Sequence, residues 1–228
     1  MLSFPPDGRL RDFQDFILKV YGVPDDRLFS IWDLVSNQER FATRALKGIR
    51  KGDYEKIKYN LLIAFSWLMA VANRFHIDIE EEVWQRFPAL CSYCGKRPCE
   101  CKKIKPPRRL EVPHYEGRRP KTISGYQSMF NDIYPPQGRT TADAGVHLAE
   151  EMGEASEAIH SYLGEHKEDQ FAKLQMELAD LVSCIFGVAN SVKIEVAKEL
   201  ALIFNNNCHI CHEAPCVCSF SSVAKFKS

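Results

Sequence analysis

The stretches HLAEEMGEASEAIHSYLG (residues 147–164) and LQMELADLVSCIFGVAN (residues 174–190) decide the fold class. In both, apolar residues recur three and four positions apart, which is the period of an amphipathic α-helix. Suitable N-cap residues precede the first stretch at Thr140, Thr141 and Asp143. No convincing run of alternating polar and apolar residues indicates a β-strand. The sequence therefore predicts an all-α fold.

Each of these two predicted helices carries an acidic pair, Glu151 with Glu154 and Glu177 with Asp180. A spacing of three residues places both carboxylates of a pair on one helical face. Antiparallel packing of the helices would bring four like charges together, and such a cluster needs a compensating cation. Mg²⁺ and Mn²⁺ are bound by carboxylate oxygens and keep water ligands for substrate phosphates. An acidic, solvated helix face is the alternative that the spacing alone leaves open.

The cysteines indicate that the chain is a duplication. Eight of the nine form two sets with the same C-x2-C-x4-C-x-C spacing, and the sets are 117 residues apart. AVANRFHIDIEEEV (residues 70–83) and GVANSVKIEVAKEL (residues 187–200) lie at the same offset, whereas Tyr21 and Tyr134 match at an offset of 113. We attribute this difference to a longer loop in the second copy, around residues 164–170. The predicted organisation is two tandem repeats and a linker: residues 1–102, 103–125 and 126–228.

The predicted linker, KIKPPRRLEVPHYEGRRPKTISG (residues 103–125), contains four prolines and two glycines, which disfavour a continuous helix. From Lys102 to Lys121 it carries eight Lys or Arg residues against two Glu. This excess of positive charge is typical of a solvated tether and equally of a segment that contacts phosphate or RNA.

The two cysteine sets are candidate metal sites, with the members Cys91, Cys94, Cys99 and Cys101 in the first and Cys208, Cys211, Cys216 and Cys218 in the second. Four thiolates within 11 residues suit one tetrahedral Zn²⁺ per set. The N-terminal stretch lacks the apolar segment of a secretory signal, which favours metal over disulfides. Iron–sulfur clusters and disulfides are the alternatives. Each set follows the last helix of its repeat, so we expect a structural zinc knuckle there.

AEEMGEASEAI (residues 149–159) followed by ELADLV (residues 177–182) resembles the E-x-x-E…E-x-x-D signature of MazG-like all-α nucleotide pyrophosphohydrolases. The resemblance continues into GVANSVKIEVAKELA and covers residues 126–207, while the cysteine sets lie outside the family's pattern. It implies Mg²⁺-dependent hydrolysis of a nucleoside or deoxynucleoside triphosphate to the monophosphate and pyrophosphate. Because family members pair such helical units across a dimer, it also implies that the two repeats form an internal pseudo-dimeric helix bundle.

Carried over to this sequence, the resemblance implies four metal ligands: Glu151, Glu154, Glu177 and Asp180. Glu150 is a candidate for orienting or deprotonating the attacking water. Lys173 and Asn207 are candidate substrate contacts. Each of these residues also has a purely structural interpretation. Glu150 would be a surface glutamate, Lys173 would form an ion pair with Glu177, and Asn207 would belong to an asparagine run that ends a helix.

The first repeat lacks the acidic residues of the second. Projection of the four ligand positions onto it gives Gln38, Phe41, Asn60 and Ile63. The charge is also inverted, with a net +3 over residues 30–63 and a net −8 over residues 143–180. We expect the first repeat to cover the site and to offer basic groups to the triphosphate. A scaffold with a solvated basic face is the alternative.

Composition limits the other classes of function. The formal net charge of zero excludes a uniformly basic nucleic-acid coat, and 45% hydrophobic residues support a packed globular core. The longest strongly apolar stretch, residues 61–72, is shorter than the roughly 20 residues that span a bilayer. We therefore expect a cytoplasmic protein without a membrane partner. The resemblance implies a nucleoside triphosphate as the substrate, and a homodimer is a possible assembly.

A second class of function uses the same features without turnover. The two zinc knuckles and the basic linker are compatible with a nucleic-acid-binding or nucleotide-sensing module. Against nucleic-acid binding, the knuckles have few aromatic residues on which bases could stack, with Tyr93 and Phe220 the nearest.

Overall fold

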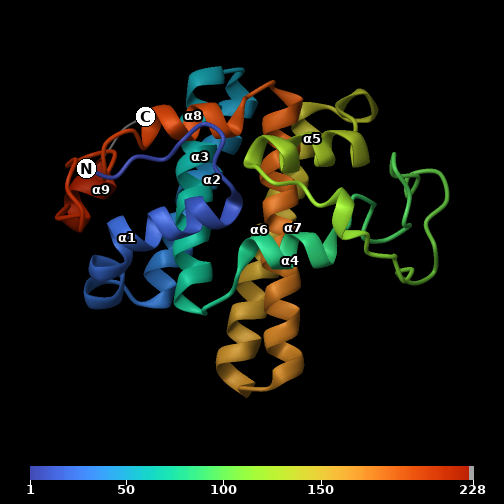
Figure 1. Ribbon diagram of the computed structural model, residues 1–228, viewed down its shortest axis with the longest axis horizontal. Coiled ribbons are helices and arrows are strands. Elements are labelled where there is room, and N and C mark those ends of the chain that lie inside the picture. Colours follow the sequence, from blue (N-terminus) through green and yellow to red (C-terminus); the bar gives the residue numbers. More distant parts are fainter. Residues whose placement is uncertain (226–228) are drawn as a thin grey trace. The chain divides into compact units, whose positions relative to one another are not determined.

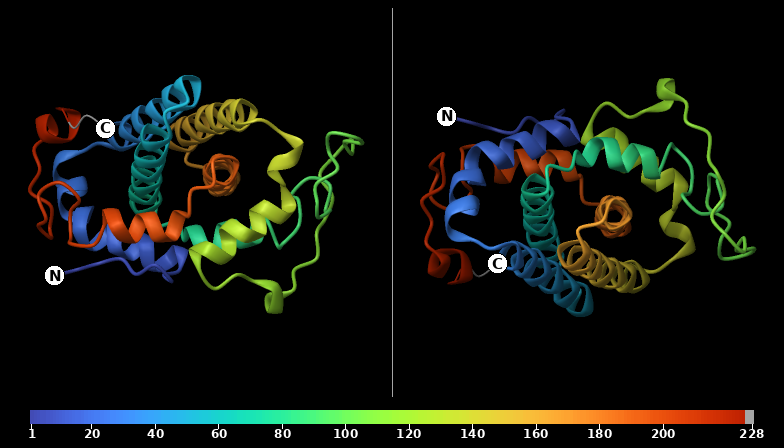
Figure 2. Two further views of the ribbon diagram at one scale, coloured as in Figure 1. Left: turned by 90° about the horizontal axis from the view of Figure 1, so that it is seen from above. Right: turned by 90° about the horizontal axis from the view of Figure 1, so that it is seen from below.

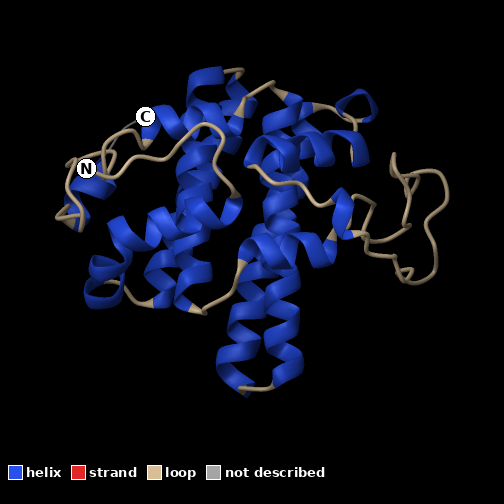
Figure 3. Ribbon diagram, in the orientation of Figure 1, coloured by secondary structure: helices blue, strands red, loops and turns tan. Residues whose placement is uncertain are grey.

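The computed structural model describes residues 1–225, and all regular structure in this range is helical (Figures 1 and 3). This confirms the predicted all-α class. In chain order the helices are α1 (Leu10–Leu28), α2 (Ile31–Lys51), α3 (Tyr54–Arg74), α4 (Ile79–Arg86), η1 (Glu116–Arg118), α5 (Ile123–Ile133), η2 (Pro136–Gly138), α6 (Thr141–Glu165), α7 (Glu168–Ser191), α8 (Val196–Ile203) and α9 (Phe220–Lys225).

Within the described range, no single helix combines the length and the apolar content needed to cross a bilayer. The helices α3 and α4 meet that test only when they are taken together, across the break between them.

The chain forms two compact units. Unit 1 consists of Met1–Asp78 and the segment from Ile194 onward, and unit 2 consists of Ile79–Lys193. Each unit therefore combines the first three helices of one predicted repeat with the following short helix and cysteine set of the other. In unit 2, α4 and the first cysteine set accompany α5, α6 and α7. In unit 1, α8 and the second cysteine set accompany α1, α2 and α3.

The centre of unit 2 is the hairpin of α6 and α7, on which α4 and α5 pack along α7 (Figure 2). Helix α6 begins with a capping box, in which the Thr140 side chain accepts from the Asp143 N–H and Asp143 accepts from the Thr140 N–H. Its apolar stripe is buried, with Leu148 fully inaccessible to solvent. These features explain why the predicted N-cap and the predicted helical face are both observed.

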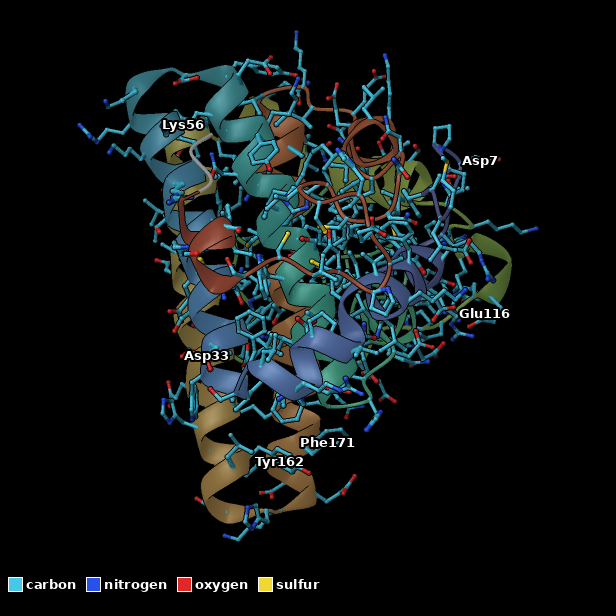
Figure 4. All side chains as sticks on the ribbon, turned by 90° about the vertical axis from the view of Figure 1, so that its left-hand side faces the viewer. Asp7, Asp33, Lys56, Glu116, Tyr162 and Phe171 are labelled. Atoms are coloured by element: carbon cyan, nitrogen blue, oxygen red, sulfur yellow. The ribbon has the colours of Figure 1, made fainter. Side chains whose placement is uncertain are left out.

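The tip of this hairpin contains residues 164–170, for which the sequence analysis predicts a longer loop. Helix α6 runs to Glu165 and α7 starts three residues later, at Glu168. The rings of Tyr162 and Phe171 pack against each other with centroids 5.0 Å apart, near the closed end of the hairpin (Figure 4). The extra residues of this segment thus lengthen both helices and do not form a loop.

Unit 1 is built around a hairpin of the same kind, α2 with α3. Helix α2 also begins with a capping box, formed by Ser30 and Asp33, and ends at Gly52, whose φ of 65° favours glycine. Helix α1 packs on α3 through an aromatic cluster in which Phe13 contacts both Phe65 and Phe204.

The residues of the two hairpins can be aligned along their whole shared length. Helices α2 and α6, however, do not align at the offset of 113 residues that Tyr21 and Tyr134 suggest. The capping boxes of α2 and α6 are 110 residues apart, and their buried positions match at this offset, as Leu34 does with Ala144. Helices α3 and α7 align at 117. At these offsets Glu151 corresponds to Phe41 and Glu154 to Arg44, whereas the sequence-based projection used Gln38 and Phe41.

Candidate metal centre

The hairpin of unit 2 brings three of the four predicted ligands together. Glu151 on α6 and Glu177 and Asp180 on α7 each offer a carboxylate oxygen, and these oxygens lie within 4.8 Å of one another. The i, i+3 spacing on α7 places its two carboxylates on the face that packs against α6. Glu154, one turn further along α6, is exposed and lies outside this group. We call Glu151, Glu177 and Asp180 the acidic trio.

The acidic trio is largely buried, with Glu151 half-buried, and it is incompletely hydrogen-bonded. Glu177 is 9% exposed and Asp180 is 7% exposed. Within the described part of the chain, the buried Oε2 atoms of Glu151 and Glu177 have no hydrogen-bond partner. Since burial and neighbouring carboxylates both disfavour the charged form, the pKa of Glu151 is raised to about 8. The pKa of Glu177 is raised for the same reasons, and the charge of Glu154 contributes to both shifts.

Arg86, at the end of α4, is a site residue that the sequence did not suggest. Its Nε donates to Asp180 Oδ1 at 2.9 Å, and its Nη2 pairs with Asp180 Oδ2. Both side chains are only 10% exposed. The guanidinium therefore compensates one carboxylate of the acidic trio and fixes its orientation.

A cavity of about 410 Å³ adjoins the acidic trio within unit 2. Glu151 and Asp180 line it, and so do cationic, aromatic and thiol side chains from four other segments. The cationic, tyrosine and histidine members are Tyr93, Lys102, Lys105, Arg109, Tyr134, Arg139 and His147. The cavity thus combines buried carboxylates with at least four cationic side chains, and it has the size of a small-molecule site.

The remaining predicted site residues lie elsewhere. Glu150 is exposed on α6 and does not line this cavity. Lys173 is half-buried and lies one turn before Glu177. Its positive charge lowers the pKa of Glu177, but burial raises that pKa by more. Asn207 belongs to unit 1, where its side chain accepts from the Leu2 N–H at 2.7 Å and donates to the His212 carbonyl at 2.9 Å.

Both cysteine sets are gathered into compact clusters. In the first set, the Sγ atoms of Cys91 and Cys101 are 3.8 Å apart, and those of Cys94 and Cys99 are 3.9 Å apart. Four sulfur atoms at about 2.3 Å from a tetrahedral zinc ion lie roughly 3.8 Å from one another. A disulfide would need about 2.05 Å, and all nine cysteines are free thiols. The residues therefore fit a four-thiolate metal site in each set.

The histidines beside the second set do not replace a cysteine. His209 Nδ1 lies 3.0 Å from the hydroxyl oxygen of Tyr21. Burial lowers the pKa of His209 to about 4, which keeps the ring neutral. The four candidate ligand atoms of this set are all cysteine sulfurs.

The corresponding place in unit 1 is mostly apolar, with Asp25 as a carboxyl in its lining. A cavity of about 40 Å³ adjoins the second cysteine set there, and its lining includes Phe41, Ile63 and Trp67. Phe41 and Ile63 align with Glu151 and Asp180 of unit 2, and both are buried. Unit 1 thus contains no counterpart of the acidic trio at these positions.

The chain matches no protein-family model, no curated protein and no solved structure. The chemistry of the site must therefore be argued from its own residues.

Proposed function

We propose that unit 2 is a Mg²⁺- or Mn²⁺-dependent hydrolase that converts a nucleoside or deoxynucleoside triphosphate to the monophosphate and pyrophosphate. The observation that carries this proposal is the pair of buried, unpartnered carboxylate oxygens of Glu151 and Glu177 beside Asp180. A buried carboxylate without a donor is unfavourable. A hard divalent cation removes that cost for several carboxylates at once, and it retains positions for phosphate oxygens.

The lining of the adjoining cavity favours a phosphate ester as the substrate. Lys102, Lys105, Arg109 and Arg139 line the same cavity as Glu151 and Asp180. A site that holds both carboxylates and cations suits a metal–polyphosphate complex, since the metal is bound by the first and the remaining phosphate charge by the second. The resemblance of residues 149–182 to the MazG-like signature points to the same reaction.

In the proposed reaction, a water oxygen forms a bond to the α-phosphorus while the bond to the bridging oxygen breaks. Pyrophosphate leaves, and one water proton is released. When bound, Mg²⁺ would neutralise phosphate charge and make water more acidic. The acidic trio would hold the ion, and Arg86 would keep Asp180 oriented. Glu154 stays the candidate for a fourth ligand, and Glu150 for the group that orients or deprotonates water.

We also infer that units 1 and 2 derive from a tandem repeat that forms a MazG-like pseudo-dimer, with one structural Zn²⁺ in each cysteine set. The support is the equal construction of the hairpins α2–α3 and α6–α7, with matching capping boxes and buried positions. The identical cysteine spacing agrees with it. On this interpretation only unit 2 is catalytic.

The replacement Glu177→Gln tests the proposed function. Pyrophosphate release from each common NTP and dNTP should fall by roughly 100-fold or more. Loss of a residue that only supports a metal ligand already costs up to about 100-fold, and Glu177 is proposed as a ligand itself. Mn²⁺ binding, followed by electron paramagnetic resonance, should weaken in parallel. Glu157→Gln, an exposed change on α6, is the matched control and should leave both unchanged. Equal turnover and equal Mn²⁺ affinity in the two variants would refute the proposal.

Nucleic-acid binding is the second candidate, and the contacts of the linker within unit 2 make it weaker. Arg119 pairs with Glu81 at 2.8 Å, and its Nη2 lies 3.9 Å from Glu80 Oε1. This cation of the linker is therefore engaged with its own unit. RNA or DNA affinity that falls steeply with salt and is unchanged in Glu177→Gln would favour this alternative.

A further inference from the structure

Part of the cavity beside the acidic trio is formed by the first cysteine set and the start of the linker. We call residues 91–109 the knuckle wall. Its side chains in the cavity include Tyr93, Lys105 and Arg109. None of these belongs to the hairpin that carries the carboxylates.

The knuckle wall is attached to the end of α5 through the cysteine set itself. The Cys99 N–H donates to the Ile133 carbonyl at 2.8 Å. The Tyr134 hydroxyl donates to Cys91 Sγ at 3.5 Å. Two of the four cysteines thus contact the segment that leads from α5 towards α6. The position of the wall in the cavity consequently depends on the fold of the cysteine set.

The ring of Tyr93 contacts two of the cations by which the wall lines the cavity. Lys105 Nζ lies 4.9 Å from the centroid of its ring, and the guanidinium carbon of Arg109 lies 5.6 Å from it. The carbonyl of Tyr93 also accepts from the Leu110 N–H at 3.1 Å, which ties the linker to the cysteine set. Cations at these distances from an aromatic face are attracted to it. The ring therefore keeps both charges at the cavity.

Arg109 is directed towards the acidic trio without a short bond to it. Its Nη2 lies 3.8 Å from Asp180 Oδ2, beyond the range of a good hydrogen bond. The side chain of Arg109 is 47% exposed, whereas the side chain of Asp180 is 10% exposed and has its short contacts with Arg86. Arg109 can therefore turn its planar donors to a ligand beside the metal centre while Asp180 keeps its partner.

We propose that Lys105 and Arg109, positioned by Tyr93, bind the polyphosphate chain of the substrate. The first cysteine set is then a ligand-binding element as well as a structural one. The proposal rests on the proposed function for the class of ligand, a phosphate anhydride next to the metal. Arginine binds phosphate through two parallel hydrogen bonds and lysine through a compact charge, so the pair suits successive phosphates.

The test uses inorganic tripolyphosphate with Mg²⁺, measured by titration calorimetry on the full chain, so that no base has to be chosen. The double variant Lys105→Ala, Arg109→Ala should bind at least tenfold more weakly than the wild type. The control is Lys103→Ala, Arg108→Ala, which removes two exposed charges from the same linker outside the cavity. Its affinity should stay within twofold of the wild type at the same salt concentration.

Variants of Tyr93 test whether its ring positions Lys105 and Arg109, because they leave the charge of the protein unchanged. Tyr93→Phe keeps the aromatic face and should bind tripolyphosphate like the wild type, whereas Tyr93→Ser should weaken binding. Equal losses in the two double variants, no loss in either, or no binding by the wild type would each overturn the proposal. Near-ultraviolet circular dichroism and the zinc content show that each variant is folded.

The two proposals fail separately. Turnover that disappears in Glu177→Gln, together with normal tripolyphosphate affinity in Lys105→Ala, Arg109→Ala, would leave the hydrolase in place and overturn the role of the knuckle wall. Absence of turnover with every nucleotide, together with the expected loss of tripolyphosphate affinity, would overturn the hydrolase and support the wall as a polyphosphate-binding element.

Discussion

The hairpins α2–α3 and α6–α7 share their construction and differ in what they bury. Each begins with a capping box, and each buries an apolar face along its length. At aligned positions, unit 1 has Phe41 and Ile63 where unit 2 has Glu151 and Asp180. The cavity volumes next to these positions are about 40 Å³ and about 410 Å³.

Next to these aligned positions, the scaffold is therefore filled in unit 1 and open in unit 2. In unit 1, aromatic and aliphatic side chains occupy the space, and the burial stabilises the fold directly. In unit 2, the charged groups require partners, of which Arg86 is one. The comparison teaches that the acidic trio costs stability that the apolar version avoids, which is expected of a functional site.

Removal of Arg86 should produce the largest effect. Arg86→Ile leaves Asp180 buried beside two other carboxylates, so the free energy of unfolding of unit 2 should fall by about 3–5 kcal/mol without divalent ions. Urea unfolding in the presence of a chelator measures it.

The second replacement Asp180→Ile should recover much of this loss. In unit 1 the aligned residues are Ile203 and Ile63, so the double variant imitates an arrangement that the same scaffold already contains. If the double variant were as unstable as the sum of the single variants, the two side chains would be energetically independent and the comparison would fail.

The pH dependence of stability tests the buried carboxylates of unit 2 next. The pKa of Glu151 is raised to about 8, so the folded state holds a proton that the unfolded state releases at lower pH. Stability of the metal-free protein should therefore be greatest near pH 5 and fall as the pH rises through about 8. We expect a loss of about 1–2 kcal/mol after solvent screening is allowed for.

Thermal unfolding with and without Mg²⁺ at several pH values measures this dependence. Glu151→Gln should make the curve of the metal-free protein less steep, and the raised pKa values of Glu177 and of Asp25 in unit 1 account for the slope that remains. Mg²⁺ should restore the most stability at high pH, where the carboxylates are ionised. A curve that falls equally steeply in Glu151→Gln would assign the titration to another group.

The smallest effect is expected at Gly187 on α7, which aligns with Ala70 in unit 1. A Cβ at this position would lie 2.5 Å from Arg139 Nη2, so the guanidinium would have to move. Gly187→Ala should lower tripolyphosphate affinity several-fold, since Arg139 lines the same cavity. Gly153→Ala is the control, because its Cβ would meet nothing within 4 Å. That change should only stabilise α6, by about 0.5–1 kcal/mol.

Local patterns were sufficient to predict the helices and most of the acidic cluster. The apolar period identified α6 and α7, Thr140 was a suitable N-cap, and the i, i+3 spacing placed Glu177 and Asp180 together. The cysteine spacing predicted both compact clusters. These features depend on residues that are close in sequence, so they can be predicted from the sequence alone.

Long-range packing decided the rest. Arg86 is 94 residues from Asp180, and no local signal connects the two. The alignment of the repeats was displaced by three residues because two length changes of opposite sign partly cancel. The stretch from Tyr134 to the capping box of α6 is three residues shorter than the stretch from Tyr21 to the capping box of α2, and the α6–α7 hairpin is seven residues longer than the α2–α3 hairpin. The sequence showed only their net difference of four.

The composition of unit 2 has a consequence for how the chain can be divided. A cut between the predicted repeats would separate the carboxylates in residues 126–228 from Arg86, the first cysteine set and Arg109. The N-terminal half lacks the acidic residues of the second repeat, but it still supplies residues 79–102 to unit 2. It therefore cannot be removed without loss of part of that unit. Substitutions in residues 79–109 should accordingly be grouped with those of the acidic trio when natural variants or proteolytic fragments are interpreted.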